Sequence, residues 1–193
     1  MKKFVTLLLV SLFASVAFAG VDSGTDSFGV YFDTAGNTNT LPVQPIFAPF
    51  NVYLLLMNPA APTNGFECTV TPTGAPYFML STTLGGTGAL DVDSSVNGFA
   101  VGAASDYPIV GGATVLVTWQ FMLQATTPLE FRITKASIPS MAGNLPVVTG
   151  NGLLRRCGIS SGSVTAPVAY VNSPSTPVPA EVSSFGSVKS LFR

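Results

Sequence analysis

Short runs in which apolar and polar residues alternate constrain this chain more than any other feature of its sequence. The longest covers residues 113–123, and shorter ones occupy residues 28–33, 65–71 and 129–134. Because successive side chains of a strand point to opposite faces, each run predicts a strand with one face on a core. In the longest run, the side chains expected on the buried face are Val115, Val117, Trp119 and Phe121.

Turn-forming residues separate these runs. The chain contains 19 Gly and 15 Pro, and its candidate strands are bounded by Gly, Pro, Asn and Ser. No amphipathic run of helical length occurs between residues 20 and 180. About eight to ten short strands in this order predict an all-β fold, a single antiparallel β-sandwich of jelly-roll or immunoglobulin-like type at residues 20–172.

The N-terminus has the three parts of a secretory signal peptide. Lys2 and Lys3 precede an apolar run at residues 4–13, and the small residues of Ala17-Phe18-Ala19 stand just before Gly20. The apolar run is shorter than the roughly 20 residues that a membrane-spanning helix needs. We therefore expect residues 1–19 to be removed from a secreted protein, periplasmic, extracellular or on the cell surface, with no membrane span in the mature chain.

The C-terminus divides into a linker and a tail. Residues 173–180 are rich in proline, which predicts an extended connection. Residues 181–193 predict a short amphipathic helix, whose apolar stripe comprises Phe185, Val188, Leu191 and Phe192. A helix this short is marginal in water, so we expect it to be ordered only when the stripe docks on another surface.

The chain has two cysteines, Cys68 and Cys157. In an exported protein an even pair favours a disulfide, which would close a loop of roughly 90 residues and stabilise the fold by about 4–5 kcal/mol. Two buried free thiols are the alternative. Zinc is not expected, because two distant cysteines and no histidine cannot supply the usual four ligands.

Few residues are available for catalysis. The absence of histidine removes serine and cysteine nucleophiles that depend on it, and we expect no enzyme and no cofactor. Glycoside hydrolysis would need two facing carboxylates, for which Glu67 and Glu130 are the best pair; outward, solvated positions on strands are the stronger interpretation. With 8 basic and 9 acidic residues and no basic run, the chain is not suited to bind nucleic acid.

Two further groups are weak candidates for binding. The acidic residues Asp91, Asp93 and Asp106 could contribute to a loop calcium site, although solvated turns are the stronger interpretation. Aromatic residues that could form a sugar-stacking platform are Tyr53, Tyr77 and Tyr107, together with Tyr31 and Trp119. Trp119 lies in the most apolar run, so we expect it in the core.

The order of several segments resembles cohesins and related immunoglobulin-like sandwiches of secreted bacterial proteins. The residues that carry the resemblance lie at 50–58, 64–71, 97–104, 111–121 and 129–134, within residues 28–135. The resemblance implies a nine-stranded jelly-roll sandwich without catalytic activity, and cohesins bind dockerin modules through a sheet face. No segment matches that face closely, so no binding residue is transferred. The tail is similar to aromatic-Gly-x-aliphatic-Lys endings on secreted bacterial proteins, which is compatible with sorting or docking.

Three functions follow as hypotheses. The first is a secreted, non-enzymatic binding or adhesion module that recognises a protein or carbohydrate partner. The second is a self-assembling structural subunit of a surface layer or filament, favoured by the low content of charged residues, 9% against about 25% in typical domains. The third and weakest is a glycoside hydrolase.

Overall fold

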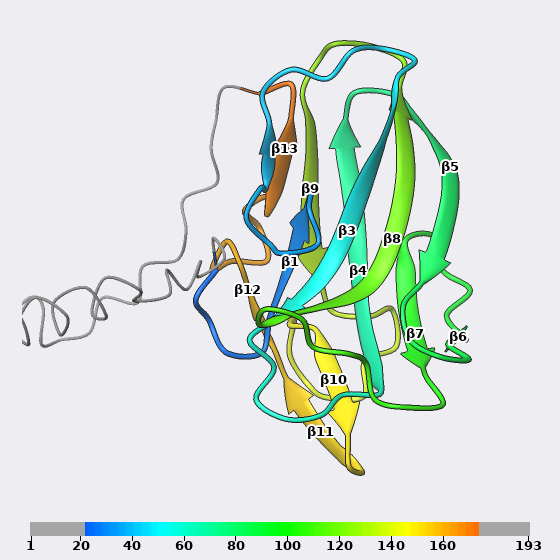
Figure 1. Ribbon diagram of the computed structural model, residues 1–193, viewed down its shortest axis with the longest axis vertical. Helices are drawn as coiled ribbons and strands as arrows, with labels where there is room; N and C mark the ends of the chain where they lie inside the picture. The colour runs from blue at the N-terminus through cyan, green and yellow to red at the C-terminus, as the bar shows by residue number, and fades with distance from the viewer. Residues whose placement is uncertain (1–21, 174–193) are drawn as a thin grey trace, which may run out of the picture.

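The computed structural model describes residues 22–173, which form two β-sheets packed face to face and no helix (Figure 1). The strands are β1 (Ser27–Tyr31), β2 (Thr40–Leu41), β3 (Pro49–Met57), β4 (Gly65–Gly74), β5 (Tyr77–Leu84), β6 (Leu90–Asp91), β7 (Gly98–Gly102), β8 (Ala113–Leu123), β9 (Leu129–Thr134), β10 (Val147–Gly150), β11 (Leu153–Arg156), β12 (Gly158–Ile159) and β13 (Ala169–Val171). The prediction of an all-β, sandwich-like fold is confirmed.

The two sheets differ in size. The five-stranded sheet has the order β12-β1-β3-β8-β5, so β5 is an edge strand. The eight-stranded sheet has the order β11-β10-β4-β9-β13-β2, with β7 also paired to β4 and β6 paired to β7. In Figure 1 the long strands β3, β8 and β5 of one sheet lie across β4 and β9 of the other.

The prediction of an antiparallel sandwich is wrong for two of the pairings. β1 pairs with β12 in parallel, and β2 pairs with β13 in parallel, so both sheets are mixed. The number of strands also exceeds the predicted range. The reason is that β2, β6 and β12 have only two residues each, too few to leave an alternating pattern in the sequence.

Alternate side chains from both sheets interlock to form the core. On β4 the inward residues Phe66, Cys68 and Val70 are buried, as their alternation predicted. Trp119 is also buried, which confirms its predicted place in the core. Across the layers, the rings of Phe121 on β8 and Phe131 on β9 are 5.5 Å apart, so aromatic packing joins the two sheets.

A β-bulge in β8 overturns one part of the predicted burial. The register against β3 shifts so that Leu54 faces Val117 while Leu55 faces Val115. The extra residue, Leu116, joins the core beside Val117, whereas Val115 packs with a second, smaller cluster that includes Leu55. Since a bulge reverses the alternation on one side of it, Val115 is not on the face predicted from period two.

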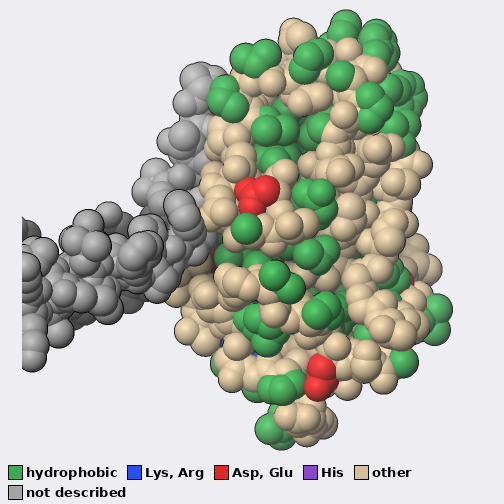
Figure 2. Space-filling view, viewed as in Figure 1, with side chains coloured by type: hydrophobic (Ala, Val, Ile, Leu, Met, Phe, Trp, Pro, Cys, Tyr) green, Lys and Arg blue, Asp and Glu red, His purple; other side chains and the backbone are tan. Residues whose placement is uncertain are grey.

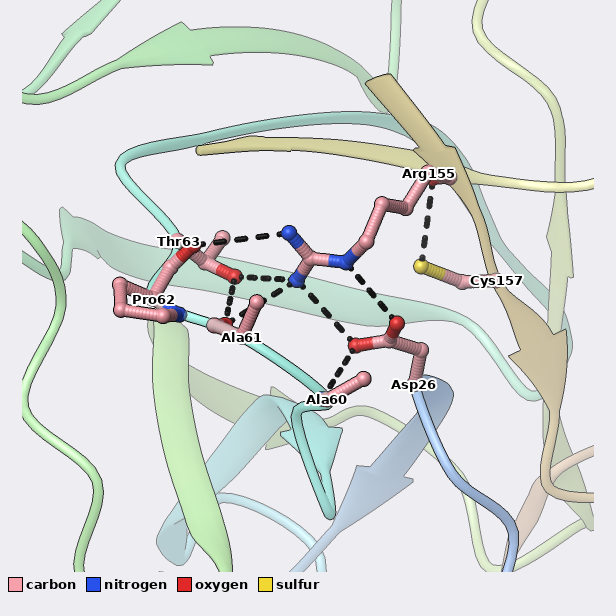
Figure 3. Close-up of polar contacts among 7 residues, drawn as sticks. All are labelled: Asp26, Ala60, Ala61, Pro62, Thr63, Arg155 and Cys157. Atoms are coloured by element: carbon pink, nitrogen blue, oxygen red, sulfur yellow. Dashed lines mark hydrogen bonds and ion pairs between the residues drawn. The ribbon is translucent and has the colours of Figure 1, made fainter. Parts of the chain in front are cut away.

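A partly buried ion pair ties three separate segments together (Figure 3). Arg155 on β11 donates through Nε to Asp26 Oδ2 at 3.0 Å and through Nη2 to Thr63 Oγ1 at 2.9 Å. The same nitrogen Nη2 donates to the carbonyl of Ala61 at 3.2 Å, and Asp26 Oδ1 accepts from the backbone N–H of Ala60 at 3.0 Å. The cluster therefore fixes the loop between β3 and β4 to β11 and to the entry of β1.

Several predictions fall outside residues 22–173. They are the signal peptide at residues 1–19, the linker after Ser173, and the tail stripe of Phe185, Val188, Leu191 and Phe192. Within the described part of the chain, no helix has the length and hydropathy needed to cross a membrane.

Replacing Arg155 by Ala is expected to lower the free energy of unfolding by about 3 kcal/mol, because it leaves the Asp26 carboxylate without its ionic partner in a site where the two side chains are only 18% and 11% exposed. The control is Arg132→Ala, which removes the exposed pair with Glu130 and is expected to cost less than about 1 kcal/mol. Urea denaturation of both variants provides the comparison. Equal losses would contradict a special role for the Arg155 cluster.

Candidate functional site

The structure does not bring the candidate glycosidase carboxylates together. Glu130 faces Thr73 across the β4–β9 ladder, and Thr73 lies six positions along β4 from Glu67. At about 3.3 Å per residue this is roughly 20 Å, whereas paired glycosidase carboxyls lie about 5–9.5 Å apart. The expected solvated position is wrong for Glu67, which is buried and accepts from the N–H and Oγ of Ser140, both at 2.7 Å. Glu130 is partly exposed and pairs with Arg132 at 2.6 Å.

The acidic candidates for calcium serve as local hydrogen-bond acceptors. Asp91 Oδ1 accepts from the backbone N–H groups of Asp93 and Ala100, at 3.0 and 2.9 Å. Asp93 accepts from Ser95 N–H and Ser137 Oγ, and these hydrogen bonds lower the pKa of its carboxyl. Among residues 22–173, Asp106 and these two aspartates do not form a group of three that could hold a metal ion.

The tyrosine candidates do not share a surface. Tyr107 is buried against Phe66, with ring centroids 6.3 Å apart, and burial raises the pKa of its hydroxyl to about 12. Tyr77 turns inward onto Phe121 at 4.9 Å, while Tyr53 packs beside the smaller cluster of Tyr31, Leu55, Met57 and Ala113. The three rings therefore point to different places and form no platform for a sugar.

Cys68 and Cys157 are buried free thiols, so the predicted disulfide is absent from the structure. Cys68 lies on β4, and Cys157 follows β11 and donates its backbone N–H to Pro146. Because β10 separates β4 from β11 in the sheet, the two cysteines are not on neighbouring strands, whereas a disulfide needs Cα atoms within about 7 Å. Burial raises the pKa of both thiols, that of Cys157 to about 12.

The best-formed candidate site is an apolar cavity of about 180 Å³ at the open side of the sandwich, which we call the edge cavity. It lies between β5 and β8 of one sheet and β4, β7 and β9 of the other. Its lining residues are Val70, Pro72, Met79, Thr82, Asn97, Gly98, Phe99, Trp119, Phe121 and Phe131. The aromatic side chains are buried, while Met79 and Thr82 are exposed and form the outer rim.

The cavity is open because β4 loses its partner on one side. β7 pairs only with residues 65–69 of β4, and the chain turns away at Asn97, which has a positive φ of 63°. Val70 still donates its N–H to Asn97 on that side. Because backbone groups of alternate residues point to the same side of a strand, the nitrogen of Pro72 also faces this side. β4 has no partner strand there, so the absence of an N–H at Pro72 costs no ladder hydrogen bond.

β5 forms the other border of the cavity and is an unprotected edge. Its eight residues include no charge and no proline, two of the devices that discourage pairing with another chain. The only irregularity is a bulge at Leu80, between Met79 and Ser81. Phe78, Met79 and Leu80 are 47%, 41% and 45% exposed, so this edge presents both unpaired backbone groups and apolar side chains.

An exposed apolar patch continues from β5 around the end of the sandwich. Phe78 faces Met122, which faces Pro49, across the outer face of the five-stranded sheet. Phe47, 61% exposed, donates its backbone N–H to Leu123 at the end of β8, which fixes it near this row. In Figure 2 hydrophobic side chains gather along the upper end of the molecule and charged ones are sparse.

Sequence reasoning missed this site for identifiable reasons. The pattern of residues 77–84 is a weak strand signal, because apolar and polar residues do not alternate along it. The signal that points to it is different: eight consecutive uncharged residues, apolar in the first half and rich in Thr in the second, are typical of a strand that pairs readily. The role of Pro72 could not be read without the register of β4.

No protein-family model, curated protein or solved structure matches this chain. The class that the structure itself defines is a two-sheet, sandwich-like β domain with mixed sheets, an apolar cavity at its open side and one unprotected edge strand.

The native protein is expected to react very slowly with a thiol-specific reagent such as DTNB, because both thiols are buried and only the thiolate is a nucleophile. After unfolding in denaturant without reductant, both Cys68 and Cys157 should react. Failure of either to react after unfolding would show that the two had formed a disulfide.

Stability is expected to fall at alkaline pH. Burial raises the pKa of Cys157 from 9.0 to about 12 and that of Tyr107 from 10.0 to about 12. Between pH 9 and 12 the unfolded chain therefore loses protons that the folded chain retains, so the free energy of unfolding decreases as the pH rises. Below pH 9 both states keep these protons, and the contribution to stability is complete. A Cys157→Ala, Tyr107→Phe variant should show a shallower decrease in denaturation measured across this range; an unchanged slope would contradict the assignment.

Proposed function

We propose that this protein is an exported, non-enzymatic binding module that captures an uncharged polypeptide segment along β5, with one aromatic side chain of that segment in the edge cavity. The observation that carries the proposal is the unpaired, uncharged β5 edge beside an apolar cavity. In such binding, main-chain hydrogen bonds to the edge supply affinity and pockets for side chains supply specificity.

The size and lining of the cavity favour a single aromatic ring. A cavity of about 150 Å³ lined by apolar side chains admits benzene, and the edge cavity holds about 180 Å³. Phe99, Trp119, Phe121 and Phe131 offer ring edges and faces for an inserted ring. Charged segments are disfavoured, because an ion moved into this lining would lose its hydration without gaining a partner.

A polypeptide partner is favoured over a carbohydrate. The tyrosines that could have stacked on a sugar are separated, and the edge cavity offers a glycan few polar groups. The side-chain hydrogen-bonding groups in its lining are those of Thr82 and Asn97 and the indole N–H of Trp119. Export is part of the proposal and rests on the signal-peptide pattern of residues 1–19. A cohesin-like jelly roll, which would also make the domain a partner-binding module, is supported by the two-sheet architecture.

A structural subunit of a surface layer or filament is the second candidate, and the same unprotected edge favours it. Pairing of β5 with β5 of another copy would use the edge backbone groups but leave the edge cavity unfilled. The cavity therefore favours capture of a segment that carries an aromatic side chain.

A phage-displayed library of random peptides, panned on the protein lacking residues 181–193, is expected to yield uncharged sequences with an aromatic residue. The strands that the structure describes, and the core and cavity that they form, lie within residues 22–173, so this shortened chain retains the site. Selected peptides should lose affinity about tenfold or more on Thr82→Glu, which places a charge at the rim of the cavity.

The matched control is Thr83→Glu, one residue further along β5. Thr83 is also exposed, but it faces Thr118 on the outer side of the sheet rather than the cavity, so this charge should leave affinity for a ring in the cavity nearly unchanged. Enrichment of no peptide, or equal losses in the two variants, would overturn the proposal. Binding to a glycan array without binding to peptides would replace it with a carbohydrate-binding function.

A further inference from the structure

The described chain ends beside the proposed site. β13 runs to Val171, which faces Leu129 on β9, and Leu129 faces Gly74 at the end of β4. Two strand spacings, about 10 Å, therefore separate Val171 from Gly74. Gly74 is followed by only two residues before β5 begins at Tyr77, so the exit of the tail and the start of β5 lie at the same end of the sandwich, as Figure 1 also shows.

A pair of side chain–backbone contacts fixes this exit point. The Asn172 amide nitrogen donates to the carbonyl of Gln44 at 3.1 Å, and the Gln44 backbone N–H donates to Asn172 Oδ1. Gln44 also donates through Nε2 to the carbonyl of Ala48 at 3.1 Å. The segment between Gln44 and Ala48 includes Phe47 of the exposed apolar patch, so the chain leaves the fold next to that patch.

The chain beyond the exit is long enough to reach the cavity. An extended linker of residues 173–180 would reach roughly 25 Å at about 3.1 Å per residue, more than the two strand spacings, about 10 Å, between Val171 and Gly74. Thirteen residues follow in the tail, 181–193, and β5 has eight. A short tether also gives the tail an effective concentration on the order of millimolar at its own domain.

The composition of the tail fits the edge. Residues 182–188, Val-Ser-Ser-Phe-Gly-Ser-Val, carry no charge, and neither does β5. Phe185 is the first aromatic residue after the linker and stands between Ser184 and Gly186, small residues that let a backbone approach a strand edge closely. One ring with small neighbours matches a cavity with room for one ring.

We infer that the tail of this protein is a ligand for its own domain: residues 183–187 lie extended along β5 of the same chain, in place of the short helix that their pattern predicts, and the ring of Phe185 occupies the edge cavity. This inference rests on the proposed function and names the first occupant of the site. The tail satisfies edge backbone groups that β5 leaves unpaired. An exported partner binds by displacing this segment.

The test uses the full exported chain with the photoreactive residue p-benzoylphenylalanine in place of Phe185. Irradiation is expected to give cross-links to the peptides that contain Met79 or Trp119, in protein that migrates as a monomer. The same residue in place of Thr176, in the linker, is the control and should give no cross-link to these peptides. Cross-links only between two copies, only to other regions, or none at all would overturn the inference.

Trp119 provides a second readout, because it is the single tryptophan of the chain and lines the cavity. Phe185→Ser should shift its emission to longer wavelength and increase quenching by acrylamide, while Phe192→Ser should leave both close to those of the unaltered chain. Library peptides that depend on Thr82 should also bind the Phe185→Ser chain more tightly than the unaltered one. If such peptides bind both chains equally and Trp119 is unchanged, the tail inference fails while the binding function stands; if no peptide binds the chain lacking residues 181–193, the binding function itself fails.

Discussion

The ring of Phe121 is the contact on which both the sandwich and its open side depend. It packs against Phe131 of the facing sheet at 5.5 Å, against Tyr77 on β5 at 4.9 Å, and against Trp119 and Phe50 within its own sheet at 6.5 and 6.2 Å. The same ring lines the edge cavity. Because one side chain holds the layers together and borders the cavity, the shape of the cavity is set by the rigid interior rather than by loops.

The sequence was most informative where strands have one buried and one solvated face. In β9 the alternation of side chains identified both the strand and its inward residues, since burial of one face imposes period two. In β4 it identified the inward residues, although Glu67 on the opposite face is buried as well. The same reasoning placed Val115 on the wrong face, because the bulge at Leu116 adds one residue that no local pattern announces. The parallel pairings of β12 and β2 were equally invisible, since they depend on how distant segments meet at the sheet edges.

The candidate site was harder to predict than the fold. Residue type alone pointed to Glu67, Glu130 and the aspartates as candidates. In the structure, Glu67, Asp91 and Asp93 accept hydrogen bonds from other residues of the domain, and Glu130 forms an ion pair. The disulfide was predicted from the compartment and the number of cysteines. The position of β10 between the strands that carry or precede the two cysteines depends on the sheet topology, which the sequence does not reveal. The edge cavity exists because β4, beyond residue 69, and β5 have no partner strand on one side. The missing partners can be recognised only when the pairing register of the strands is known.

Pro72 makes the open side of the sandwich asymmetric. Two borders face each other there, but the border formed by β4 carries a ring nitrogen where an ordinary residue would offer a donor, whereas the border formed by β5 has its full complement of backbone groups. A guest chain consequently finds a complete set of backbone donors and acceptors along β5 but lacks one donor along β4, which favours extension of the five-stranded layer. One preferred border on this side suits a one-to-one complex better than stepwise growth of a fibre through that opening.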